Sequence, residues 1–148
     1  MLGVEALRRG ASIVTDTKMA WSGINKKKLS EYGGEAFCFM SDEDVAEEAK
    51  KRECTRAAVC MERGAALDGE VIFAVGNAPT ALIRLYELIR EEKVRPALII
   101  GAPVGFVNVV EAKELIMAAG VPYIVPRGRK GGSNIAATIC NAMLYAKV

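Results

Sequence analysis

The second half of the chain alternates short apolar runs with longer stretches of helical hydrophobic period, and glycine or proline marks nearly every junction. The apolar runs cover residues 71–75, 98–100 and 123–125, and the helical stretches cover 81–91, 109–119 and 134–145. Short, continuously apolar strands that alternate with helices are typical of a parallel sheet covered on both faces. This half therefore predicts three consecutive strand–helix units.

The first half follows the same pattern less regularly. We expect the end of a helix over 2–9, a strand over 12–16, a short helix over 17–24 and a buried strand over 36–40. A long helix then begins at Ser41 and Asp42 with a capping signature, bends near Glu53 and continues to residue 67. Right-handed crossovers leave few topologies for five such units, and we prefer the strand order 2-1-3-4-5. The fold class is thus α/β, one domain over residues 1–148.

The composition excludes several classes of protein. Apolar residues make up 51% of the chain, charged residues 26%, and the formal charge is +2, so we expect a globular protein with no nucleic-acid or membrane partner. No leader pattern and no apolar run of membrane-spanning length is present, which predicts a cytoplasmic protein. The four cysteines form no C-x-x-C pair and are expected to be buried, reduced thiols.

The chain has no histidine. This removes the commonest general acid or base, the commonest zinc ligand and every serine–histidine or cysteine–histidine pair. We therefore predict no metal site, and any proton chemistry within the chain must use other side chains or the ligand.

In a sheet of this order, a ligand is expected at the carboxyl ends of the first and third strands. Asp16 and Thr17 follow the first strand, and the segment GNAPT, residues 76–80, follows the third and opens a helix. Free N–H groups at that helix start suit an anion, and Asn77 adds a donor and an acceptor. The alternatives are ordinary helix capping for this segment and a capped turn for Asp16.

Three further segments are candidates. The loop 101–107 (GAPVGFV) offers an aromatic side chain to a flat ligand or a partner chain, or tucks under the sheet edge. The segment 127–134 combines three cations with three glycines before a helix that Ser133 is expected to cap, which suits carboxylates or phosphates; the alternative is a solvated basic turn. Thr55 and Arg56 fall inside the predicted long helix, where Arg56 is either a ligand contact or a surface arginine.

Taken together, these segments resemble the precorrin-8X methylmutase family, also called cobalt-precorrin-8 methylmutases. The matching pieces, in the family's order and spacing, are Asp16 with Met19 and Gly23-Ile24, Thr55-Arg56, GNAPTAL at 76–82, PVGFV at 103–107 with Glu111 and Lys113, Val121-Pro122, and GRKGGS at 128–133 before a helix that ends in Asn141-Ala142. They cover nearly the whole chain, and GNAPTAL with PVGFV is the most specific combination.

The resemblance implies a flavodoxin-like three-layer α/β/α fold, a homodimer with its sites near the subunit interface, and a corrin precursor that bears many carboxylates. It implies an isomerase of cobalamin biosynthesis that moves a methyl group from C11 to C12 of precorrin-8X or cobalt-precorrin-8, a [1,5]-sigmatropic shift, with no redox cofactor. The enzyme would position a flat polyanionic ring and assist its protonation. The candidate substrate-binding residues are Arg56, Thr55, Asp16, Thr17, Gly76, Asn77, Thr80, Gly105, Arg127, Arg129, Lys130, Gly131, Gly132 and Ser133.

The sequence also departs from the family pattern. Family members carry several dozen residues before the position that matches Met1, and that segment supplies the histidine taken to be the proton donor. No residue here inherits this role, so no catalytic residue is assigned. Asn108 and Ala112 replace a usual glycine and serine beside PVGFV. Two alternatives stay open: a methylmutase-related protein that binds tetrapyrroles with little or no activity, and an unrelated anion-binding α/β module.

Overall fold

A parallel five-stranded sheet forms the centre of the protein. The computed structural model describes residues 2–104, 109–126 and 131–146. In chain order the elements are α1 (Leu2–Arg8), β1 (Ser12–Thr15), α2 (Lys18–Gly23), α3 (Lys26–Glu31), β2 (Ala36–Cys38), α4 (Glu43–Arg52), α5 (Arg56–Ala65), β3 (Val71–Val75), α6 (Pro79–Arg90), β4 (Leu98–Gly101), α7 (Val109–Met117), β5 (Tyr123–Ile124) and α8 (Ser133–Leu144). The order is β2-β1-β3-β4-β5 and every pair is parallel, which confirms the predicted topology.

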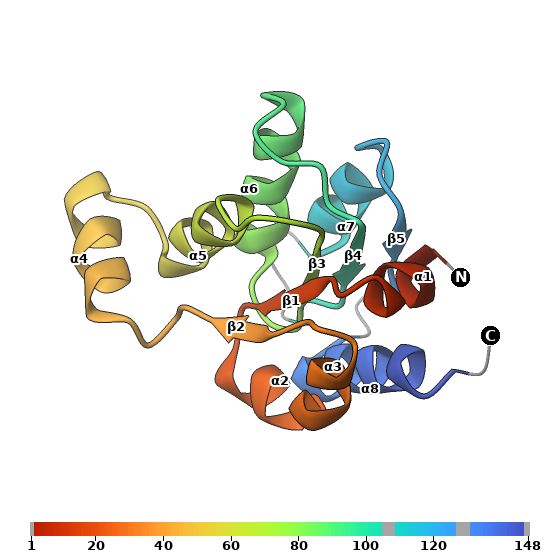
Figure 1. Ribbon diagram of the computed structural model, residues 1–148. Coiled ribbons are helices and arrows are strands. Elements are labelled where there is room, and N and C mark those ends of the chain that lie inside the picture. Colours follow the sequence, from red (N-terminus) through yellow and green to blue (C-terminus); the bar gives the residue numbers. More distant parts are fainter. Residues whose placement is uncertain (1, 105–108, 127–130, 147–148) are drawn as a thin grey trace.

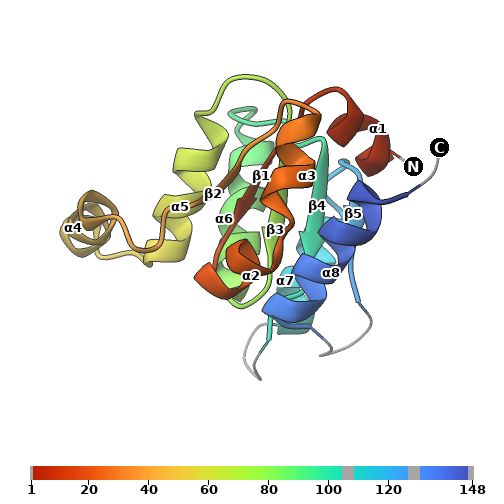
Figure 2. The ribbon, with the colours of Figure 1, turned by 60° about the horizontal axis from the view of Figure 1, so that its bottom comes forward.

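Helices cover both faces of this sheet (Figure 1; Figure 2). Val14, Phe73 and Ile99 belong to an apolar cluster that they share with α4, α5, α6 and α7. Neighbouring strand residues, such as Ile13 and Ile72, point to the other face and pack with α1, α3 and α8. Because successive side chains of a strand alternate between faces, the continuously apolar strands serve both layers. The three-layer α/β arrangement is therefore as expected.

The middle of the sheet is much better buried than its edges. All five residues of β3 are buried, whereas all three residues of β2 are half-buried and both residues of β5 are exposed. Full burial of one large apolar side chain contributes about 1.5–3 kcal/mol to the free energy of unfolding. Burial therefore stabilises β3 more than the edge strands β2 and β5, and β3 is the strand that leads into the turn at Gly76. The prediction of a buried strand over 36–40 was wrong: β2 is an edge strand and ends at Cys38.

The predicted long helix is two helices. Residue Glu53 has a φ of 54°, in the left-handed region, and the N–H of Cys54 bonds back to the carbonyl of Ala49 at 3.0 Å. This arrangement ends α4, and Thr55 then caps α5 through its side chain, which accepts a bond from the N–H of Ala58 at 3.1 Å. The bend expected near Glu53 is a complete break, so Thr55 and Arg56 stand at a helix start.

Local details differ from the prediction in three more places. Helix α3 over Lys26–Glu31, capped by the Asn25 side chain, was not predicted. The residue that precedes α4 is Asp42, and its side chain makes no capping bond, so the capping role expected of Ser41 was wrong. All four cysteines are free thiols, but only Cys60 and Cys140 are buried as expected, whereas Cys38 and Cys54 are half-buried. No helix in the described ranges is long and apolar enough to cross a membrane.

Candidate functional site

The carboxyl ends of β1, β3 and β4 meet the start of α8 at one edge of the sheet. The register pairs Thr15 of β1 with Ala74 of β3, and Val75 of β3 with Gly101 of β4, so these strands end side by side. The chain turns that follow them bring together residues that are sixty or more positions apart in sequence. Most of the described site residues predicted from the sequence lie at this edge.

Asp16 lies in the middle of this arrangement and is only 1% exposed. Its Oδ1 accepts a hydrogen bond from the N–H of Gly76 at 2.7 Å, and its Oδ2 accepts from the N–H groups of Asn77 at 3.0 Å and Ala78 at 2.7 Å. These three N–H groups precede α6, where a helix attracts negative charge. The anion that the sequence led us to expect at this helix start is therefore a side chain of the protein itself.

Burial and hydrogen bonding act on the Asp16 carboxyl in opposite directions. Loss of solvent raises the pKa of Asp16 above its ordinary value, and the N–H groups of Gly76, Ala78 and Asn77 oppose that rise. The carboxylate is 1% exposed and its oxygens already accept three bonds from the turn. Asp16 is thus a built-in part of the turn.

The turn between β3 and α6 touches the segment before α8 through main-chain atoms. A Cβ added to Gly76 would lie 2.7 Å from Cα of Ser133, so no side chain fits there. A Cβ on Gly131 would likewise collide with the carbonyl oxygens of Ala102 and Pro103. The N–H of Gly132 bonds to the carbonyl of Ala102 at 2.7 Å. Glycine at 76 and 131 therefore permits the close approach of three turns.

The hydroxyl groups of Thr17 and Ser133 are 2.7 Å apart and share a hydrogen bond. Thr17 also caps α2, since its Oγ1 accepts a bond from the N–H of Ala20 at 3.0 Å. The prediction that Ser133 caps α8 was wrong: Gly132 precedes the helix with a φ of 125°, which favours glycine, and Ser133 is its first residue. Ser133 instead connects the last helix to the first turn.

Thr55, Arg56 and Thr80 form a second, more open group. Thr55 Oγ1 donates to Thr80 Oγ1 at 3.4 Å, and Arg56 Nη1 donates to the carbonyl of Met40 at 3.4 Å. All three residues are exposed. The structure therefore places Arg56 on the surface at the start of α5, which leaves its guanidinium available.

A cleft of about 400 Å³ between α5 and α6 begins at Thr55 and Thr80. Its far wall carries Glu62, which is paired with Arg52 at 2.6 Å and with Arg84 at 2.8 Å. These arginines hold the pKa of Glu62 below its ordinary value. The charges on this wall are thus largely compensated, in contrast to Arg56.

Sequence reasoning did not assign two features of this region. Met19 is 64% exposed although it is apolar, and it lies two residues after Thr17. Lys113 is only 2% exposed, and its Nζ donates to the carbonyl of Pro126 at 2.8 Å; burial lowers the pKa of Lys113. The buried contact of Lys113 joins residues thirteen positions apart and has no local sequence signal. Gly105, Arg127, Arg129 and Lys130 lie outside the described residues.

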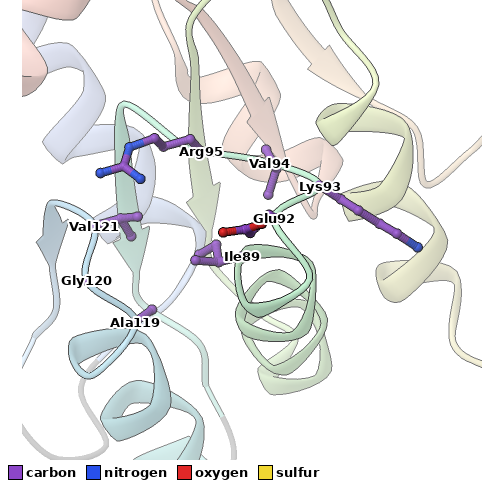
Figure 3. Close-up of a pocket in the computed structure, with 8 residues that line it drawn as sticks. All are labelled: Ile89, Glu92, Lys93, Val94, Arg95, Ala119, Gly120 and Val121. Atoms are coloured by element: carbon purple, nitrogen blue, oxygen red, sulfur yellow. The ribbon is translucent and has the colours of Figure 1, made fainter.

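A separate pocket of about 330 Å³ lies at the opposite edge of the sheet, between the ends of α6 and α7 (Figure 3). The side chains of Ile89, Val94 and Val121 line it together with Glu92, Lys93 and Arg95. This pocket lies before β4 and β5, so it is not the place where parallel sheets bind ligands. Within the described ranges, no group of three or more acidic or cysteine residues is arranged to hold a metal ion.

The fold and site together define a doubly wound α/β protein whose polar turns gather at the β1–β3 switch point. Residues 2–146 match the model of the precorrin-8X methylmutase family, CbiC. The chain belongs to the precorrin-8X methylmutase family.

Named relatives agree with this assignment. The chain is 45% identical over 150 residues to the cobalt-precorrin-8 methylmutase of Leptospira interrogans, which covers 96% of the chain and 68% of the relative. It is 44% identical over 142 residues to the enzyme of the same name from Salmonella typhimurium, with 95% and 66% covered. The solved structure of precorrin-8X methyl mutase from Thermus thermophilus matches with a TM-score of 0.85 and 40% identity, and covers 97% of this chain and 70% of that one.

These names are those of isomerases of cobalamin biosynthesis, and they favour the methylmutase interpretation over the alternative of a related binding protein. The chain spans about two thirds of the length of the curated relatives it matches, for example 63% of the relative from Priestia megaterium.

Proposed function

We propose that this chain carries out the family reaction, the movement of a methyl group from C11 to C12 of precorrin-8X or cobalt-precorrin-8. The observation that carries the proposal is the continuous family match over residues 2–146, which includes every strand-end segment described above. The reaction is an isomerisation: one carbon–carbon bond breaks, one forms, and no second reactant is needed to balance atoms or electrons.

The geometry supports a role in positioning a flat polyanion. The exposed guanidinium of Arg56 and the hydroxyls of Thr55 and Thr80 are suited to carboxylate arms. The Thr17–Ser133 pair and the main chain at Asn77 lie on the other side of the same edge. We propose these residues, together with Gly76, Gly131 and Gly132, which allow the turns to pack closely, as the substrate-binding site. Gly105, Arg127, Arg129 and Lys130 stay part of the proposal on sequence grounds.

The wider setting of the protein is also proposed. We propose that residues 1–148 act as one domain in the cytoplasm and that the protein is a homodimer. The exposed side chains of Leu2, Tyr123 and Ile124 around a cleft of about 310 Å³ at the β5 edge support self-association. Sedimentation of the purified protein tests this part, since a single-chain mass at micromolar concentration contradicts it.

The test of the reaction uses purified protein with precorrin-8X and, in a parallel arm, cobalt-precorrin-8. The change in the visible spectrum reports conversion, and NMR of the product reports a methyl group on C12 with no change in mass. Conversion supports the proposal. Tight binding without conversion supports the related binding protein, and neither binding nor conversion contradicts both.

A further inference from the structure

Asp16 combines deep burial with three hydrogen bonds to one turn. Its carboxylate is 1% exposed and accepts from the N–H groups of Gly76, Asn77 and Ala78. A polycarboxylate ligand gains nothing from approaching this group directly, because like charges repel and the carboxylate is buried. Direct contact with the substrate is therefore a poor description of what Asp16 does.

Main-chain contacts connect the buried Asp16 to the hydroxyl groups of Thr17 and Ser133. Gly76, which donates to Asp16, touches the backbone of Ser133 so closely that a Cβ does not fit. Ser133 in turn bonds to Thr17, the residue next to Asp16. The adjoining strand end is fixed as well, because Thr15 Oγ1 donates to the carbonyl of Thr17 at 3.0 Å. These contacts close a ring that begins and ends at the carboxyl end of β1.

We infer that Asp16 is a positioning residue, whose carboxylate holds the β3–α6 turn and, through Gly76, sets the Thr17–Ser133 hydroxyl pair that faces the substrate. That the hydroxyl pair faces the substrate rests on the proposed function; that Asp16 holds the turn and the pair in place does not. It also follows that the N–H groups before α6 serve the protein's own carboxylate, so that the carboxylates of the substrate bind elsewhere on this edge.

The experiment compares Asp16→Asn with the unchanged protein. An amide offers one oxygen and one NH₂ group in place of two oxygens, so at least one of the three N–H donors faces another donor. We expect hydrogen exchange at Gly76 to Ala78 to become at least about tenfold faster, and exchange at Ser133 to follow. The matched control is Asp68→Asn, the same change at an exposed turn position, which leaves these amides unchanged.

Ligand binding then separates positioning from contact. Titration with precorrin-8X is expected to show about tenfold weaker binding by folded Asp16→Asn protein, since a misplaced hydroxyl pair loses about one good hydrogen bond. Tighter binding overturns the inference, because it shows that Asp16 faced the substrate and repelled it. Unchanged binding with unchanged exchange at Ser133 also overturns it. If the unchanged protein does not bind precorrin-8X, the proposed function fails and the exchange result alone decides the inference.

A second variant covers the case in which Asp16→Asn does not fold. Gly76→Ala keeps the Asp16 carboxylate but pushes the turn away from Ser133. We expect faster exchange at Ser133 and weaker binding here too. Preserved exchange and binding in Gly76→Ala show that the turn does not set the hydroxyl pair, and contradict the inference.

Discussion

The two groups of residues at the carboxyl edge are built in opposite ways. We name the group around Asp16, Gly76, Ser133 and Thr17 the closed half, because it is held by main-chain contacts and hydrogen bonds of 2.7 to 3.0 Å. We name Thr55, Arg56 and Thr80 the open half; these residues are exposed, and the bonds of Arg56 and between the two threonines are 3.4 Å long. The difference indicates that the closed half supplies a fixed shape, while the open half supplies charge that adjusts to the ligand.

The sharpest test of this contrast is the substitution Asp16→Ala. It leaves three N–H groups without their carboxylate in a buried place, and we expect a loss of about 3 kcal/mol in the free energy of unfolding. Urea unfolding measures the change. Asp68→Ala, at an exposed turn, is the control and should stay within about 0.5 kcal/mol of the unchanged protein. Equal effects of the two changes contradict the closed half as described.

Gly76→Ala tests the main-chain contact of the closed half. The added methyl group collides with Cα of Ser133 at 2.7 Å, and we expect a loss of about 2 kcal/mol. Gly120→Ala is the comparison: Gly120 has a φ of 83° but open space around it, so the cost there is only the unfavourable backbone, about 1 kcal/mol. Thermal unfolding of both variants separates collision from conformation, and a larger loss at Gly120 argues against the contact.

The open half should respond in binding and not in stability. We expect Arg56→Ala to leave the free energy of unfolding within about 0.5 kcal/mol and to weaken precorrin-8X binding about tenfold, or about 1.4 kcal/mol. Arg95→Ala provides the control, since Arg95 is an exposed arginine at the opposite edge (Figure 3). An unfolded Arg56→Ala protein shows that Arg56 is structural, and equal binding by both variants removes it from the site.

A smaller effect is expected at the break that presents Arg56. Glu53 has a φ of 54°, a conformation that glycine adopts without strain. Glu53→Gly should therefore raise the free energy of unfolding by about 0.5–1 kcal/mol without a change in ligand affinity. Glu92 has a φ of 58° far from the site, so Glu92→Gly should match it in urea unfolding. A loss of stability at Glu53 alone means that this carboxylate has a local role.

The closed half and the wall of the cleft beside the open half, which carries Glu62, should also differ in their response to pH. Arginine pairing lowers the pKa of Glu62, so its contribution to stability is present above the unfolded value near 4.5 and is lost as the pH falls through the folded value. Burial raises the pKa of Asp16, so the pH-dependent part of its contribution is present below the unfolded value near 3.8 and is lost as the pH rises through the folded value, while the three N–H bonds to the carboxylate remain.

Urea unfolding as a function of pH, on both sides of the unfolded values near 3.8 and 4.5, measures both slopes. Glu62→Gln should reduce the free energy of unfolding that is lost on acidification by about 0.5 kcal/mol, a typical value for a partly exposed ion pair. Asp16→Asn should remove the opposing slope. If Glu62→Gln increases the loss of unfolding free energy at low pH, the pairing of Glu62 with Arg52 and Arg84 does not stabilise the folded state.

The sheet could be predicted from the sequence because its strands are continuously apolar and its junctions carry glycine or proline. The break after α4 could not, since Glu53 is not a residue that favours the left-handed region; it is fixed there by main-chain bonds of Glu53 and Cys54 back to α4 and by the Thr55 cap of α5. The partial exposure of β2 and β5 likewise arises because each pairs with a strand on one side only, which their apolar sequences do not indicate.

The site was predictable as a place but not as a set of contacts. Strand order alone locates Asp16 beside Gly76, yet the carboxylate reaches N–H groups sixty or more positions away. Local patterns therefore suggested a free anion site before α6 and a capping serine at Ser133. In both cases a long-range partner engages the group, and local patterns do not encode such partners.

The hydroxyl pair has a consequence for how the protein is made. Thr17 and Ser133 are 116 positions apart in the sequence. During synthesis Thr17 leaves the ribosome long before Ser133, and all residues of β1 to β4 have been made while the pair is still absent. A nascent chain of this length contains Thr17 but not its partner hydroxyl, so the pair forms only after α8 has been made.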